Sequence, residues 1–290
     1  MKKTAFLYII LAGICWGTSG IFLKNLVAYG FTPIQTTSVR AVVAATGFAL
    51  YVLLTDRKSF KVSLKELLFF ALGGAAIYGT AAFYFSAIEA SSASTAVVLM
   101  YTAPVIVMVF SVAFLGEKFN IAKLVSVVLV TVGCALVSGI IGGLKFSVFG
   151  IILGLFAGVA YSSYNLVTRI QMMKGMKSTS STLYGFVFMA VISLIVTNPA
   201  ETFDVAVKAS PTAIPLMIGI GVVTCVLPYL FYTLALRDIP AGTASSLAVV
   251  EPVAATLFSV FIFGEKLDIT SIIGIVLILS AVLILSKSEE

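Results

Sequence analysis

One acidic side chain, Glu251, lies inside a long apolar stretch that runs from Thr243 to Phe263. If this stretch is helical, a rise of about 1.5 Å per residue places the carboxyl about 12 Å from the start of the helix. An ionised carboxylate at that depth in a membrane costs about 2.5 to 3.5 kcal/mol, so burial favours the protonated acid unless a cation or water compensates. We predict that Glu251 binds a proton or the amine of a ligand. A structural glutamate that is hydrogen-bonded across helices is the alternative.

Arg40 is a basic residue in a comparable position, about 10 Å into the apolar segment from Pro33 to Leu54. A guanidinium at that depth needs Glu251, an anionic ligand group or helix-end carbonyls as a partner. Its length also allows the charge to reach the membrane interface. A binding role and a structural role therefore both stay open.

Polar-tipped side chains inside the apolar runs are the remaining binding candidates. A hydroxyl or amide there needs a partner, and an aromatic ring can stack on a ligand. Packing or an interhelical hydrogen bond explains each one taken singly, but together they predict a lined cavity. These residues are Trp16, Tyr78, Tyr101, Tyr161, Asn165 and Tyr229, and Tyr164 belongs to the same class.

Two prolines, Pro104 and Pro252, lie inside apolar runs and lack the amide hydrogen that a helix requires. Each is predicted to kink its helix and to leave the carbonyl four residues earlier, on Met100 or Ala248, without its normal partner. Such carbonyls can bind a ligand or let the helix hinge as a gate. A kink that serves packing alone is the alternative.

The composition limits the class of protein. The chain has 290 residues, of which 60% are hydrophobic and 10% charged, and its mean hydropathy is +1.15. These values exclude a soluble protein and predict an all-α integral membrane protein in a lipid bilayer. There is no histidine and the three cysteines form no CxxC pair, so we predict no metal site and no cofactor.

Ten segments have the apolar character of membrane spans. They are Ala5 to Val27, Pro33 to Leu54, Glu66 to Ala87, Ser91 to Leu115, Ile121 to Ile141, Val148 to Ile170, Thr179 to Thr197, Thr212 to Leu236, Thr243 to Phe263 and Ile269 to Leu285.

The basic residues are concentrated in every second connection between these ten segments. If the N-terminus is cytoplasmic, thirteen lysines and arginines fall on the inner side and only Lys24, Lys145, Lys208 and Lys266 on the outer side. The basic residues behind the net charge of +6 are therefore distributed as in a membrane protein whose cytoplasmic loops are positively charged. No nucleic-acid partner is expected. We predict a multi-pass protein of the cell membrane with both termini in the cytoplasm.

An internal repeat divides the chain. The stretch Ala93 to Lys118 aligns without gaps on Ala241 to Lys266, and it matches Pro104 to Pro252 and one Gly-Glu-Lys triplet to the other. Because the repeat contains an odd number of spans, its copies have opposite orientation in the bilayer. We expect residues 1–141 and 142–290 to form two inverted five-helix repeats around a central cavity. Gly13-x-x-x-Gly17 and Gly154-x-x-x-Gly158 near the starts of these halves favour close helix packing.

The sequence resembles the drug/metabolite transporter superfamily, specifically its EamA-type ten-helix members. The resemblance covers nearly the whole chain and rests on Trp16-Gly17, Arg40, Pro104, Gly116-Glu117, Glu251-Pro252 and Gly264-Glu265. It implies a secondary transporter, not an enzyme, that exports or exchanges small metabolites, often amino acids, through a cavity lined by both repeats. Alternating access and a proton as coupling ion at Glu251 are the mechanism we expect.

Other functions are weighed against this expectation. A passive channel or a regulatory membrane subunit remains open. An intramembrane enzyme is disfavoured, because the runs contain neither paired acids nor a nucleophile with a base. No GxxxxGK[ST] loop is present, which disfavours an ATP-driven pump. A monomer is sufficient because both halves lie on one chain, and a weak homodimer is also compatible.

Overall fold

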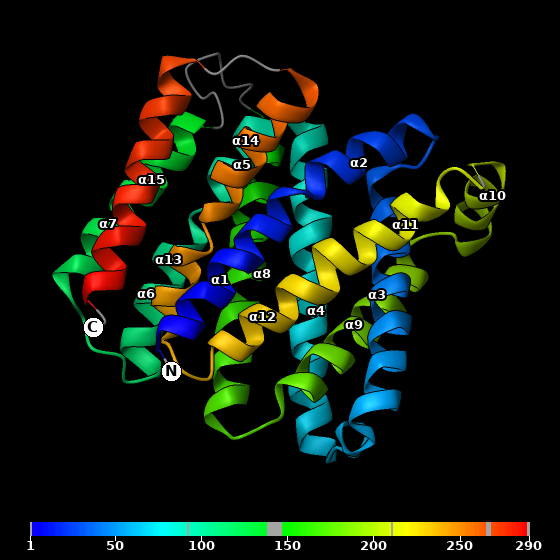
Figure 1. Ribbon diagram of the computed structural model, residues 1–290, viewed down its shortest axis with the longest axis horizontal. Helices are drawn as coiled ribbons and strands as arrows, with labels where there is room; N and C mark the ends of the chain where they lie inside the picture. The colour runs from blue at the N-terminus through cyan, green and yellow to red at the C-terminus, as the bar shows by residue number, and fades with distance from the viewer. Residues whose placement is uncertain (1, 92, 138–146, 210, 265–267, 289–290) are drawn as a thin grey trace.

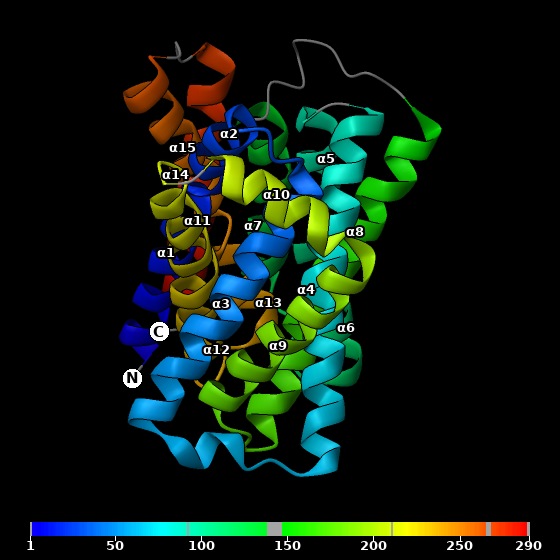
Figure 2. The same cartoon turned by 90° about the vertical axis from the view of Figure 1, so that its right-hand side faces the viewer.

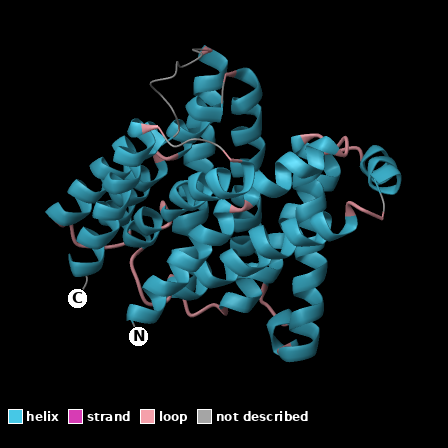
Figure 3. Cartoon of the chain, turned by 45° about the horizontal axis from the view of Figure 1, so that its top comes forward, coloured by secondary structure: helices cyan, strands magenta, loops and turns pink. Residues whose placement is uncertain are grey.

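The computed structural model describes residues 2–91, 93–137, 147–209, 211–264 and 268–288. In these ranges the regular structure is helical throughout, as Figure 3 shows. The helices of the first half are α1 (Lys2–Gly17), α2 (Ser19–Ala28), α3 (Pro33–Thr55), the short 3-10 turn η1 (Arg57–Phe60), α4 (Leu64–Ala90), α5 (Ala93–Met100), α6 (Ala103–Phe114) and α7 (Ile121–Val137).

The helices of the second half run from Val148 to Ser288. They are α8 (Val148–Met173), α9 (Ser178–Val196), α10 (Pro199–Ala209), α11 (Ile214–Gly221), the π-helical turn η3 (Val222–Val226), α12 (Leu227–Ala235), α13 (Ala241–Leu247), α14 (Val250–Phe263) and α15 (Ile269–Ser288). Helix α10, which carries charged residues, was not predicted from the sequence.

The helices are those of a multi-pass membrane protein. In the described part of the chain, seven helical stretches are long and apolar enough to cross a bilayer. The apolar stretches Val98–Phe114, Ile121–Val137 and Ile269–Ile284 are shorter. Several segments predicted as single helices are divided: the first at Thr18, the fourth at Tyr101 and Thr102, and the ninth at Ala248 and Val249.

Both chain ends lie at the same end of the helix bundle, which Figure 1 shows along its lower edge. The connections α3–α4, α6–α7, α8–α9 and α12–α13 lie at that end too, and we call it the terminal face. The α2–α3 connection and α10 lie at the opposite end, called the far face here. The connections thus alternate between two faces, as expected of a chain that crosses a membrane repeatedly.

The interior is formed where the two halves meet. Helix α4 packs on α8 and α9, α1 packs on α12 and α14, and α3 packs on α9. Helices α7 and α15 lie side by side at one edge of the bundle (Figure 1). These contacts all join a helix of the first half to one of the second, so the halves are not separate globular units.

Two glycine pairs allow close helix contacts, as the sequence predicted. A Cβ added at Gly158 would lie 2.8 Å from Oγ1 of Thr102 and 3.0 Å from the carbonyl oxygen of Leu99. A Cβ added at Gly17 would lie 2.7 Å from the Cβ of Ala254 and 2.9 Å from the amide nitrogen of Ala255. Helix α8 therefore packs against the break between α5 and α6, and α1 packs beside the break between α13 and α14.

These contacts predict the effect of one added methyl group. Gly17→Ala forces α1 and α14 apart and should destabilise the folded protein by about 1–3 kcal/mol, the usual cost of overpacking. The measurement is the thermal unfolding midpoint of the purified protein in detergent. Gly47→Ala is the matched control, because no atom lies within 4 Å of a Cβ built at Gly47 in helix α3. Equal midpoints for the two variants would contradict this account of the packing.

Candidate functional site

Glu251 lies at a break in the ninth segment and not in an unbroken helix. Helix α13 ends at Leu247 and α14 begins at Val250, so the carboxyl belongs to the first turn of α14. The carbonyl of Ala248, which Pro252 was predicted to leave without a partner, accepts the amide of Glu251 at 3.0 Å. The proline thus produces the predicted break, but a tight turn satisfies this carbonyl, so it is not available as a ligand-binding group.

The equivalent break in the first half directs a tyrosine at Glu251. Tyr101 lies between α5 and α6, immediately before the turn that contains Pro104. Its hydroxyl is within hydrogen-bonding reach of the Glu251 carboxylate. Tyr101 belongs to the same buried hydrophobic cluster as Val249 and Val253, which flank the acid in sequence. The two broken helices therefore meet at this acid.

Further polar side chains surround the same carboxylate. Tyr84 of α4, Tyr161 of α8 and Tyr229 of α12 are close enough to interact with its charge. Glu251 itself is only partly buried. Glu251, Arg40, Tyr101, Tyr161 and Tyr229 are called the central site here.

Arg40 enters the central site from α3. Its charge acts on Glu251 and on Tyr229, but the ion pairs found among the described residues do not include one between Arg40 and Glu251. Its Nε atom is buried without a hydrogen-bond partner. The site thus holds an acid and a base that do not neutralise each other by direct contact.

Aromatic rings form one wall of the site. The Trp16 and Tyr229 rings are 5.3 Å apart in an edge-to-face arrangement, and Tyr164 lies 5.2 Å from Tyr229. Phe186 and Tyr232 extend the cluster at centroid distances of 5.4 Å from Tyr229 and 5.5 Å from Trp16. Edge-to-face packing of this kind holds rings in fixed positions, so the wall is a rigid surface.

Two of the predicted site residues have other surroundings. Asn165 is fully buried at 0% exposure; its Nδ2 donates to the carbonyl of Tyr161 at 2.6 Å, and its Oδ1 accepts the hydroxyl of Tyr232. It therefore joins α8 to α12 and has no free group for a ligand. Tyr78 is partly buried and packs against the main core.

Some residues of the site were not among the sequence candidates. Tyr232 follows Tyr229 by three residues, as Tyr164 follows Tyr161. Residues three apart share a helix face, so this spacing is the signal that identifies Tyr232. Tyr84 carries no such signal. Cys134 of α7 also lies close enough to interact with Glu251.

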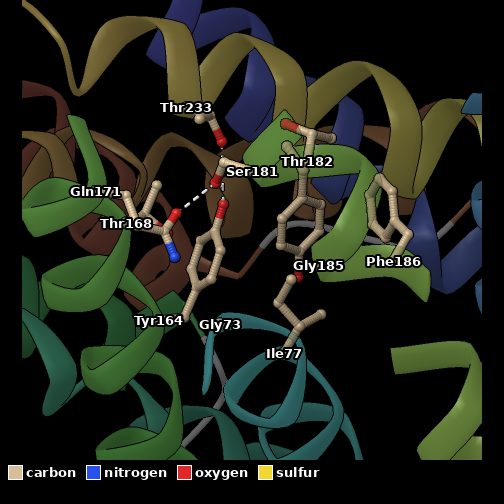
Figure 4. Close-up of a pocket in the computed structure, with 11 residues that line it drawn as sticks. Gly73, Ile77, Tyr164, Thr168, Gln171, Ser181, Thr182, Gly185, Phe186 and Thr233 are labelled. Carbon is tan, nitrogen blue, oxygen red and sulfur yellow. Dashed lines mark hydrogen bonds between the residues drawn. The ribbon is translucent and has the colours of Figure 1, made fainter. Parts of the chain in front are cut away.

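A side pocket opens between α4, α8, α9 and α12, and Figure 4 shows its lining. Polar groups line much of it: Ser181 Oγ donates to Gln171 Oε1, Tyr164 and Thr233 share a hydrogen bond, and the Thr182 hydroxyl is buried without a partner. The empty space is about 250 Å³ even when the open mouth is included. Ligand pockets usually hold about 300–1,000 Å³, so this pocket is small for a ligand, and it adjoins the central site through Tyr229.

A metal site needs several ligating side chains close together. In the described ranges no group of three or more Cys, Asp or Glu side chains could hold a metal ion. The chemistry on offer is therefore hydrogen bonding, charge and aromatic contact from the residues named above.

Comparisons with known proteins identify relatives that match nearly the whole chain. The chain is 25% identical to an uncharacterized transporter, YwfM, of Bacillus subtilis (strain 168), over 98% of this chain and 94% of the relative. It is 27% identical to an uncharacterized transporter of Clostridium kluyveri, over 100% of this chain and 95% of that protein.

A solved crystal structure shares the fold. It superposes with a TM-score of 0.84 at 16% identity and covers 99% of this chain and 98% of its own. The EamA-like transporter family model matches the sequence twice, at residues 3–139 and 148–287. Since the two matches together span nearly the whole chain, the protein belongs to the EamA-like transporter family, whose members are transporters and not enzymes.

Proposed function

We propose that the protein is a secondary transporter that exports or exchanges small metabolites, amino acids or related compounds, by alternating access. One observation carries the proposal: Glu251 and Arg40 share the central site without direct pairing. A buried charge without a partner is costly. A zwitterion supplies both missing partners, because its ammonium suits Glu251 and its carboxylate suits the planar guanidinium of Arg40.

The aromatic wall supports a ligand that is partly apolar. Trp16 and Tyr229 present ring surface beside the two charges. Ligand sites commonly combine apolar and aromatic walls with a few placed polar groups. An amino acid with an apolar side chain has this combination of properties.

The helix contacts support ten spans in two inverted repeats, residues 1–141 and 142–290. Let α1, α4, α5, α6 and α7 correspond to α8, α12, α13, α14 and α15. Exchange of the halves then converts the α4–α8 contact into α12–α1, and both contacts are present. It also converts α5–α8 into α13–α1 and, since α6 aligns with α14, α6–α8 into α14–α1, and these contacts are present too. The α7–α15 contact is returned to itself. A two-fold relation accounts for all of them.

The broken helices supply the moving parts in this mechanism. Discontinuous helices at the interface of inverted repeats are typical of alternating-access transporters. Rocking of one half against the other about the breaks before Pro104 and Pro252 would expose the central site to one face at a time. A proton that competes with the substrate amine for Glu251 would couple the two movements.

Glu251→Gln tests the acid. The variant keeps the shape and loses the charge, so we expect uptake of labelled amino acids into proteoliposomes to fall by about ten- to a hundredfold, the worth of a charged hydrogen bond. We also expect the remaining transport to lose its pH dependence. Glu201→Gln, on the surface helix α10, is the control. Unchanged and equally pH-dependent transport in Glu251→Gln would remove this residue from the mechanism.

Arg40→Gln tests the base. If the guanidinium binds the substrate carboxylate, the variant should raise KM for amino acids by about tenfold or more and should discriminate less against the corresponding amines. Competition by amine analogues in the same vesicles measures this loss. Arg57→Gln, in the loop after α3, should leave both quantities as they are. A KM that does not change in Arg40→Gln would assign Arg40 a structural role only.

The orientation is a separate proposal. The connections on the terminal face coincide with the lysine- and arginine-rich segments, and such segments remain in the cytoplasm. We therefore place the terminal face in the cytoplasm of the cell. Tags at either end should react with antibodies only after cells are permeabilised, and staining of either tag on intact cells would reverse the assignment.

Counterflow separates this proposal from the passive channel and the regulatory subunit. A carrier that exchanges substrate shows saturable uptake of label driven by unlabelled substrate on the other side. A channel equilibrates the label without this overshoot, and a regulatory subunit alone moves none.

A further inference from the structure

Glu117 connects the two halves at the terminal face. Its Oε1 accepts the amide of Ala241, the first residue of α13, at 2.9 Å. Its Oε2 lies 3.9 Å from the Nζ of Lys123, and both side chains are only 9% exposed. The structure shows that the capped helix belongs to the opposite half.

The local chain geometry fixes the position of this carboxylate. Gly116 has a φ of 68°, a left-handed conformation that glycine adopts without strain. This turn lets the amide of Glu117 bond back to the carbonyl of Ser111 at 3.2 Å. The side chain is thereby anchored to the end of α6 while it binds α13.

Helix α13 is the element that this contact holds. All seven of its residues, Ala241–Leu247, are buried. It packs against α6 and α1 and also contacts α7 and α15. It therefore fills the space between the terminal face and Glu251, four residues beyond its end.

The repeat counterpart of α13 is less enclosed. The sequence repeat aligns Val98 and Leu99 of α5 with Ser246 and Leu247 of α13. The first pair is partly exposed, whereas the second pair is buried. At these aligned positions α13 is therefore the more enclosed of the two helices. The repeat also aligns Glu265 with Glu117, but Glu265 lies outside the described residues.

We propose that Glu117 is a latch that holds α13 against the first half and keeps the terminal-face route to the central site closed. A carboxylate that accepts a backbone amide in a nearly water-free position makes a strong hydrogen bond. Opening of the terminal face requires this bond to break, since Ala241 and Glu117 lie on opposite halves. The role as a gate rests on the proposed transport function, whereas the contact itself does not.

The test measures access to α13 without any substrate. Ser245 is 1% exposed and its hydroxyl is buried without a partner, so Ser245→Cys is a nearly isosteric reporter. The protein in lipid nanodiscs is treated with a small charged methanethiosulfonate. Labelling at position 245 is followed by peptide mass spectrometry, which leaves the native cysteines in place.

Glu117→Ala should raise the labelling rate at position 245 by about tenfold or more, because it removes the acceptor for the Ala241 amide. Glu117→Gln should raise it less, since its amide oxygen still accepts that bond. Glu66→Ala is the matched control: Glu66 also caps a helix start on the terminal face, but within its own helix, through the Ser63 amide at 2.7 Å.

A rate in Glu117→Ala equal to that of the parent, or an equal rise in Glu66→Ala, would overturn the latch. If Glu117→Ala does not fold, Glu117→Gln decides, and a parental rate in that variant overturns the proposal. Failure of the unmodified protein to transport any solute would instead remove the proposed function and leave the labelling result intact.

Discussion

Two helices are broken in the middle of the protein, and the rest of the structure depends on how the backbone at these breaks is covered. Inside a bilayer, non-helical backbone is tolerated only where protein or cavity water satisfies its polar groups. At the first break Gly158 of α8 lies against backbone atoms and Gly154 against the Leu99 side chain, and at the second Gly13 and Gly17 of α1 lie against backbone atoms. The Glu251 amide further satisfies the Ala248 carbonyl. The glycine faces therefore cover the backbone that the proline breaks leave non-helical.

The central site follows from these breaks. If both segments were continuous helices, the positions of Glu251 and Tyr101 along the helix axes would be set by helical spacing alone. The breaks instead bring Tyr101, from the end of one short helix, to the acid in the first turn of another. The position equivalent to Glu251 in the first half is Ala103, so the carboxylate is an addition to an otherwise matched frame. Arg40 then faces this added charge without pairing with it.

The side chains that hold the halves together differ from those that face the site. Asn165 resembles a binding residue by its type and depth, but both ends of its amide bond to protein. Glu117 resembles an ordinary loop carboxylate, but it binds a helix of the opposite half. In both cases the residue type shows that the side chain needs a hydrogen-bonding partner. Only the position of that partner in the structure shows that the side chain joins two helices.

The sequence by itself determined the membrane class, the apolar segments, the two prolines and the glycine faces, because each depends on residue type and local spacing. It did not determine that the predicted segments containing Pro104 and Pro252 are each two helices, that α10 is present, or which tyrosines reach the acid. Those features depend on contacts between residues far apart in the chain. Tyr84 and Tyr101 approach Glu251 only because helices of both halves pack around the breaks, and no local pattern encodes that packing.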